Sequence, residues 1–173
     1  IQGAVYSLPL KMESGTMRAA KSPLDGQIYY SGLTGWQAGA TQEGSIQRLR
    51  YTGKTGIYLT EAKARKNRLQ LTFTEPVKPD SVTRESFSAS AWNYKWSKGY
   101  GSPQLKASDP ETRGIDELAI DSLELSDDGL TLTVQIPELI PCHNLKLDFA
   151  VTGKNGSALS GPVYFTIHEL PES

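Results

Sequence analysis

The chain has 173 residues, enough for one domain or one small domain plus a fragment, and enough to bury a hydrophobic core without disulfides. Its formal net charge is -1 with 21% charged residues, which argues against the clustered basic surface of a nucleic-acid-binding protein. No apolar run is long enough to span a membrane, and the single cysteine, Cys142, excludes an internal disulfide framework.

The start of the chain indicates an excised segment. It does not begin with Met, and Ile1 leads almost directly into a strand-like run, so we expect a piece of a longer polypeptide. The 16 glycines and 10 prolines, together with many Thr, Ser and Val residues, indicate β-structure with turns.

The first part of the chain alternates short strand-like runs with turns. The run Ser-Pro-Leu-Asp-Gly at residues 22–26 is typical of a turn, and several glycines indicate a loop around Trp36. The predicted strands cover residues 3–10, 16–21, 27–31 and 46–51. Four short strands in about fifty residues match one blade of a β-propeller. We therefore predict a four-stranded, blade-like segment over residues 1–53.

From Gly56 the predicted strands are longer and alternate more clearly. Apolar residues alternate with polar ones in runs centred on residues 69–73, 87–91, 118–125, 130–136, 145–151 and 163–167. Two prolines, Pro76 and Pro79, end the first run, and residues 80–83 are compatible with a short helical turn. About seven strands without a long helix pack most economically as two antiparallel sheets, face to face. The fold class is therefore all-β, with an Ig-like antiparallel β-sandwich over residues 56–170.

The stretch from Ala91 to Ser102 is the most aromatic of the chain. Trp92, Tyr94 and Trp96 alternate, so in an extended chain their rings project to one side. Their parity is opposite to that of the preceding apolar residues, which requires a bulge at residues 91–92 or a strand covered on both sides. A similar change of phase falls near residue 121.

With Tyr100, these three aromatic residues are the candidate ligand-binding residues. Flat apolar ring faces with polar edges suit sugar rings, but aromatic side chains are more often buried. We favour a packing interface, and keep a carbohydrate-binding platform as the alternative. The first hypothesis predicts buried Trp92 and Trp96 rings, and the second predicts exposed rings.

Several stretches resemble a family of exported bacterial proteins. Residues 3–6, 22–29, 32–37 and 48–53 resemble the last blade of quinoprotein sugar dehydrogenase-like propellers. Such propellers occur in multidomain proteins, often beside c-type haem domains. Similarity to the segment that follows that blade lies in residues 69–77, 92–96 and 100–102. The turn at residues 125–131 also resembles bacterial Ig-like modules. Together these stretches span nearly the whole chain.

The resemblance implies a location in the periplasm or outside the cell. It also implies a parent protein that oxidises sugars or related alcohols with pyrroloquinoline quinone (PQQ). One blade cannot build a cofactor pocket that a whole propeller makes from several blades. No Cys-x-x-Cys-His motif is present, so this segment holds no covalent haem. We expect no cofactor in this chain, while the parent carries PQQ or haem c.

Two further groups of residues are candidates for chemistry. Cys142 and His143 are adjacent and would point to opposite faces of a strand, so they cannot form a nucleophile–base pair, although His168 could approach either. We favour a buried thiol and a surface imidazole. Carboxylates that Ca²⁺ could use occur at Asp109, Glu111, Asp116, Glu117, Asp127 and Asp128. Their spacing fits no EF-hand loop, so we expect ordinary turn chemistry and no metal.

The sequence as a whole favours a non-catalytic structural or docking domain from the C-terminal part of a larger exported protein. Its partners would be the remaining domains of that protein, or a second copy pairing through exposed strand edges. The alternative is a carbohydrate-binding module with a polysaccharide ligand, and a weaker alternative is a fragment of a PQQ-dependent sugar oxidoreductase. We expect neither nucleic-acid binding nor membrane insertion.

Overall fold

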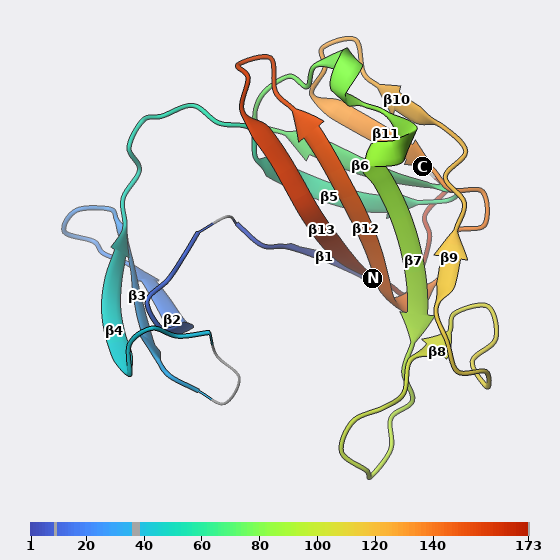
Figure 1. Cartoon of the computed structure of the whole chain (residues 1–173), viewed down its shortest axis with the longest axis horizontal. Coiled ribbons are helices and arrows are strands. Elements are labelled where there is room, and N and C mark those ends of the chain that lie inside the picture. Colours follow the sequence, from blue (N-terminus) through green and yellow to red (C-terminus); the bar gives the residue numbers. More distant parts are fainter. Residues whose placement is uncertain (9, 36–38, 173) are drawn as a thin grey trace. The chain divides into compact units, whose positions relative to one another are not determined.

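The structure, a computed structural model, describes residues 1–8, 10–35 and 39–172. The expected loop around Trp36 is centred on a residue outside the described ones. The chain divides into two compact units: Leu8–Thr55, and Ile1–Ser7 together with Gly56–Ser173. The described residues contain no α-helix, so the all-β prediction is confirmed. The strands, labelled in Figure 1, are β1 (Gln2–Tyr6), β2 (Gly15–Lys21), β3 (Ile28–Leu33), β4 (Gly44–Leu49), β5 (Leu59–Arg65), β6 (Arg68–Phe73), β7 (Phe87–Asn93), β8 (Leu105–Lys106), β9 (Asp116–Leu118), β10 (Leu123–Leu125), β11 (Thr131–Gln135), β12 (Cys142–Thr152) and β13 (Ala158–Ile167).

The larger unit is a β-sandwich of two antiparallel sheets. One sheet has the order β1-β13-β12-β7-β8, with β9 also paired to β7, and the other has the order β10-β11-β6-β5. Figure 1 shows β13, β12 and β7 side by side in one layer and β5 and β6 in the other. Two 3-10 turns, Pro79–Ser81 and Arg84–Ser86, connect β6 to β7, where the prolines predicted the end of the strand.

Alternation of apolar and polar residues builds the core between these sheets. In β6 and β11 every second side chain is buried, and Leu71 lies directly opposite Leu132 across the strand pair. Phe149 of β12 contributes the centre of an aromatic cluster, with its ring centroid 6.4 Å from that of Phe73 in the opposite sheet. Fully burying one such side chain stabilises the fold by about 1.5–3 kcal/mol. The prediction of a sandwich from alternation is therefore confirmed.

The first strand belongs to the sandwich and not to the blade-like segment. All five residues of β1 pair with β13, with Gln2 opposite Ile167 and Tyr6 opposite Val163. The side-chain amide of Gln2 also bonds to β5 at the edge of the other sheet: its Nε2 donates to the Ala64 carbonyl at 3.1 Å, and its Oε1 accepts from the Ala64 N–H at 2.6 Å. An amide side chain can do this because it carries the same donor and acceptor as a strand backbone. The predicted boundary at residue 53 is thus wrong for the first seven residues.

The smaller unit is a three-stranded antiparallel sheet, β2-β3-β4, in place of the four strands that we predicted. The turn at residues 22–26 forms as predicted: Gly26 has φ +69° and donates its N–H to the Ser22 carbonyl at 2.9 Å. Among the described residues of this unit, Ser14 is the one buried side chain, and its hydroxyl bonds to Ser45. This sheet therefore has no hydrophobic core of its own in the described part of the chain.

The two expected changes of phase have simple causes. Strand β7 runs in continuous register along β12 from Phe87 to Trp92, so there is no bulge at residues 91–92. Trp92 lies on the outer face of the sheet, opposite in parity to the buried Ala91. The change near residue 121 marks the crossing from one sheet to the other, because β9 pairs with β7 and β10 pairs with β11.

Candidate functional site

The four candidate aromatic residues lie at and beyond the end of β7. Trp92 is half-buried within the strand, whereas Tyr94, Trp96 and Tyr100 are 51%, 94% and 98% exposed. Strand pairing ends at Asn93, and no strand among the described residues pairs with the residues that follow. The expectation of a buried Trp96 is therefore wrong. We call residues 94–102, which carry these exposed rings, the aromatic loop.

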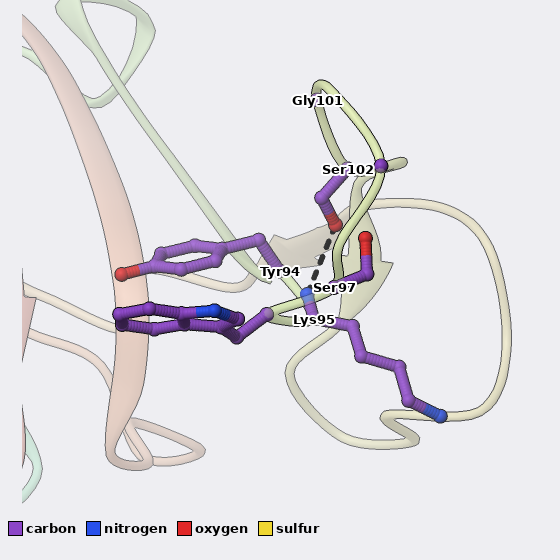
Figure 2. Close-up of a pocket in the computed structure, with 7 residues that line it drawn as sticks. Tyr94, Lys95, Ser97, Gly101 and Ser102 are labelled. Atoms are coloured by element: carbon purple, nitrogen blue, oxygen red, sulfur yellow. Dashed lines mark hydrogen bonds between the residues drawn. The ribbon is translucent and has the colours of Figure 1, made fainter.

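Short-range hydrogen bonds close the aromatic loop. The Lys95 N–H donates to Ser102 Oγ at 2.9 Å, and Ser102 Oγ in turn donates to the Pro103 carbonyl at 3.0 Å. Figure 2 shows the first of these bonds as a dashed line across the base of the loop. Backbone and side-chain bonds of this kind substitute for the missing strand ladder. They hold the two ends of the loop together.

His143 of β12 anchors the loop to the sandwich. Its Nδ1 accepts the Tyr94 N–H at 3.2 Å, and its ring centroid lies 4.5 Å from that of Tyr94. The His143 N–H donates to Asn93 Oδ1 at 2.8 Å, and its carbonyl accepts the Thr166 hydroxyl at 3.0 Å. Sequence reasoning missed this role, because no local pattern links residues that are about fifty positions apart. The predicted surface imidazole is half-buried instead, and it has a structural partner.

The loop forms a shallow hollow of about 410 Å³, open to solvent. Its lining consists of Tyr94, Lys95, Trp96, Ser97, Gly99, Gly101 and Ser102. In Figure 2 the Tyr94 ring and the Lys95 side chain extend in opposite directions from the loop, as neighbours do in extended backbone. Exposed rings beside hydroxyl groups and backbone amides offer apolar faces and hydrogen-bonding edges to a ligand. Both features are ones that the carbohydrate-binding hypothesis predicts.

The cysteine and the second histidine do not contribute to this hollow. Cys142 is buried in the core, and burial raises the pKa of its thiol to about 11, so the thiol stays protonated at neutral pH. Cys142 is buried whereas His143 is half-exposed, and the pairing of β12 with β13 has an irregularity between Cys142 and Leu145. His168 is exposed beyond the end of β13, where its N–H donates to the Ile1 carbonyl at 3.0 Å. No nucleophile–base pair results.

Three of the six candidate calcium ligands, Asp109, Asp116 and Asp128, accept hydrogen bonds from nearby residues. Asp109 accepts the Thr112 hydroxyl at 2.6 Å, and this bond holds the pKa of the Asp109 carboxyl below its usual value. Partial desolvation raises the pKa of Asp116, but hydrogen bonds from the Ser108 N–H and hydroxyl outweigh it and lower the pKa. Within residues 1–8, 10–35 and 39–172, no three His, Cys, Asp or Glu side chains lie close enough together to hold a metal ion.

A second, smaller hollow of about 190 Å³ lies where the two sheets of the sandwich meet at β1 and β5. Its lining is mixed, with Tyr6 and Leu59 beside Thr60 and Glu61. Both strands are edges of their sheets, and Gln2 bridges them at Ala64. The sequence carried no signal for this feature, because it depends on the long-range pairing of β1.

The comparisons with known proteins assign this chain to no family. A scan against models of protein families finds no match, and a search of curated proteins finds none that is significant. In the part of the chain that the structure describes, no helix has the length and apolar character needed to cross a lipid bilayer. The resemblance to quinoprotein-associated propellers therefore stays a prediction.

Proposed function

We propose that this chain is a non-catalytic structural and docking module of a larger β-rich exported protein. The observation that carries the proposal is the sheet β2-β3-β4, which buries no hydrophobic side chain among its described residues. A three-stranded sheet needs a covered apolar face for independent stability. The β2-β3-β4 sheet instead exposes large apolar side chains, and Ile46 is 81% exposed.

Free strand edges strengthen the proposal. Both β2 and β4 lie at the edges of their sheet and carry backbone groups without a neighbouring strand. Such edges pair readily with another strand. Further β-structure from the parent protein, or a second copy of the chain, would complete this sheet. The sandwich has a hydrophobic core of its own and needs no such partner to fold.

Limited trypsin digestion of the full chain tests this proposal. The smaller unit has exposed cleavage sites at Lys11, Arg18, Lys21, Arg48, Arg50 and Lys54. We expect cleavage there first, while the exposed Lys66 and Lys154 in turns of the sandwich remain uncut for longer. The N-terminal fragment should stay bound to the sandwich through the β1–β13 pairing. Equal resistance of the two units in a monomeric chain would contradict the proposal.

A specific observation favours carbohydrate binding as a second candidate function. Trp96 and Tyr100 are almost fully exposed in the aromatic loop, and Trp96 lines its hollow. Exposed aromatic side chains of this size mark binding sites, because a ligand can remove their apolar surface from water. Trp96→Ala should abolish retardation on polysaccharide gels and leave the unfolding midpoint unchanged, because the ring makes little contact with the core. A marked loss of stability in this variant would instead indicate a packing role.

A further inference from the structure

The charges around the aromatic loop are of one sign. Between Glu85 and Asp109 the chain has no acidic residue, and it has three lysines, of which Lys95 and Lys98 lie in the aromatic loop. Neither of these two takes part in an ion pair within the described part of the chain. The third, Lys106, lies near Asp109 and Asp116, whose pKa values it helps to lower. The aromatic loop therefore presents two lysines that form no ion pair with the described residues, and Lys95 lines the same hollow as Trp96.

The rest of the sandwich has the opposite balance. This unit carries more acidic than basic side chains, 16 against 12. Basic residues of this unit gather in two places, the aromatic loop and the β5–β6 hairpin, and in the hairpin Lys63 and Lys66 are paired with Glu61 and Glu172. Because residues 86–108 contain no carboxylate side chain, an anionic ligand would meet the cations of the loop without an acidic neighbour in the same segment, which favours docking there. The charges of the loop therefore indicate that the ligand is negatively charged. The aromatic rings alone give no information on the charge of the ligand.

We propose that the aromatic loop binds an anionic polysaccharide, with sugar faces on the rings of Trp96 and Tyr100 and acidic groups on Lys95 and Lys98. This inference rests on the second candidate function. The Ser97 hydroxyl lines the hollow and makes no hydrogen bond to the described residues, so it is available to sugar hydroxyls. The His143 contacts and the bond from Lys95 to Ser102 hold the loop in place for this purpose.

A nucleic acid fits these observations less well. Phosphate backbones are bound by clustered Lys and Arg residues, and the aromatic loop has two lysines and no arginine. Single-stranded DNA is therefore the control polymer in the test.

The test is affinity electrophoresis and calorimetric titration of the full chain with polygalacturonate, dextran sulfate, neutral dextran and oligo-dT. The first two polymers distinguish carboxylate from sulfate groups. The double variant Lys95→Gln/Lys98→Gln removes the cations, and Trp96→Ala removes one ring. The matched control, Lys78→Gln/Lys154→Gln, removes two exposed lysines elsewhere on the sandwich.

We expect binding to at least one acidic polysaccharide, weakened roughly threefold to tenfold in the Lys95/Lys98 variant, the size expected for two exposed ion pairs. The ring variant should lose about tenfold or more, and the lysine control should bind like the native chain. Equal binding to dextran, unchanged by the lysine substitutions, would overturn the anionic ligand and leave carbohydrate binding intact. Binding to no saccharide would overturn both. Binding to oligo-dT and both acidic polymers alike, without loss in Trp96→Ala, would show simple ion exchange and also overturn the proposal.

Discussion

Gln2 is a sensitive test of the β1 placement, because its side chain joins the edges of the two sheets of the sandwich. Gln2→Ala removes both hydrogen bonds to Ala64, at 3.1 and 2.6 Å. The Ala64 carbonyl keeps a bond from the Arg65 guanidinium at 3.2 Å, but the buried Ala64 N–H is left without its partner. With roughly 1 kcal/mol net for each lost hydrogen bond, and more for an unpaired buried donor, the free energy of unfolding should fall by about 2 kcal/mol.

Urea unfolding of the full chain measures this loss, and amide hydrogen exchange locates it. The Ala64 amide should exchange much faster in Gln2→Ala than in the native chain, whereas amides of β12 should be slowed to a similar degree in both. Gln104→Ala is the matched control, since Gln104 is exposed and its side chain makes no hydrogen bond to the described residues. A change in unfolding free energy below about 0.5 kcal/mol, with Ala64 still protected, would refute the bridging role of Gln2.

Two further predictions concern titratable groups. Burial raises the pKa of the Cys142 thiol to about 11, so at neutral pH it should react with a disulfide reagent only as fast as the sandwich opens. In denaturant the reaction should be rapid. A fast reaction of the folded chain would show that the thiol is exposed and would contradict the prediction. The hydrogen bonds from Thr112 and Ser126 lower the pKa values of Asp109 and Asp128 in the folded state. Their contribution to stability is therefore complete above the ordinary carboxyl pKa of about 4 and is lost as pH falls through the lowered values. The urea midpoint should drop below pH 4, less steeply in Asp109→Asn/Asp128→Asn, and an equal slope in that variant would contradict the assignment.

The sandwich was predictable because its strands bury one face each. In β6, β11, β12 and β13 the side-chain period of two is visible in the sequence, and burial follows it. The partner of β1 was not predictable: a short strand at the N-terminus carries no local mark of pairing with β13 at the far end of the chain. Strand β5 was also obscured, since its Lys and Arg residues resemble a polar turn, and the turn itself is confined to residues 66–67.

The sequence predicted which aromatic residues make up the candidate site, but it did not predict which of them are exposed. Alternation of Trp92, Tyr94 and Trp96 indicated one continuous strand, yet β7 stops at Asn93 because β8 supplies only two pairing residues. Beyond that point alternation no longer determines which rings are covered. The anchoring role of His143 depends on contacts between β7 and β12, which no spacing in the sequence reveals.

The most direct test of the docking role is strand-resolved amide hydrogen exchange of the full chain at low and high concentration. The proposal predicts strong protection of β6, β11 and β12 at both concentrations. It predicts weak protection of β2, β3 and β4 at low concentration, because the described residues of their unit bury no hydrophobic side chain. Protection of β2–β4 that rises with concentration would identify a second copy as the strand partner. Strong, concentration-independent protection of β2–β4 in a monomer would show that this sheet needs no partner, and would contradict the account.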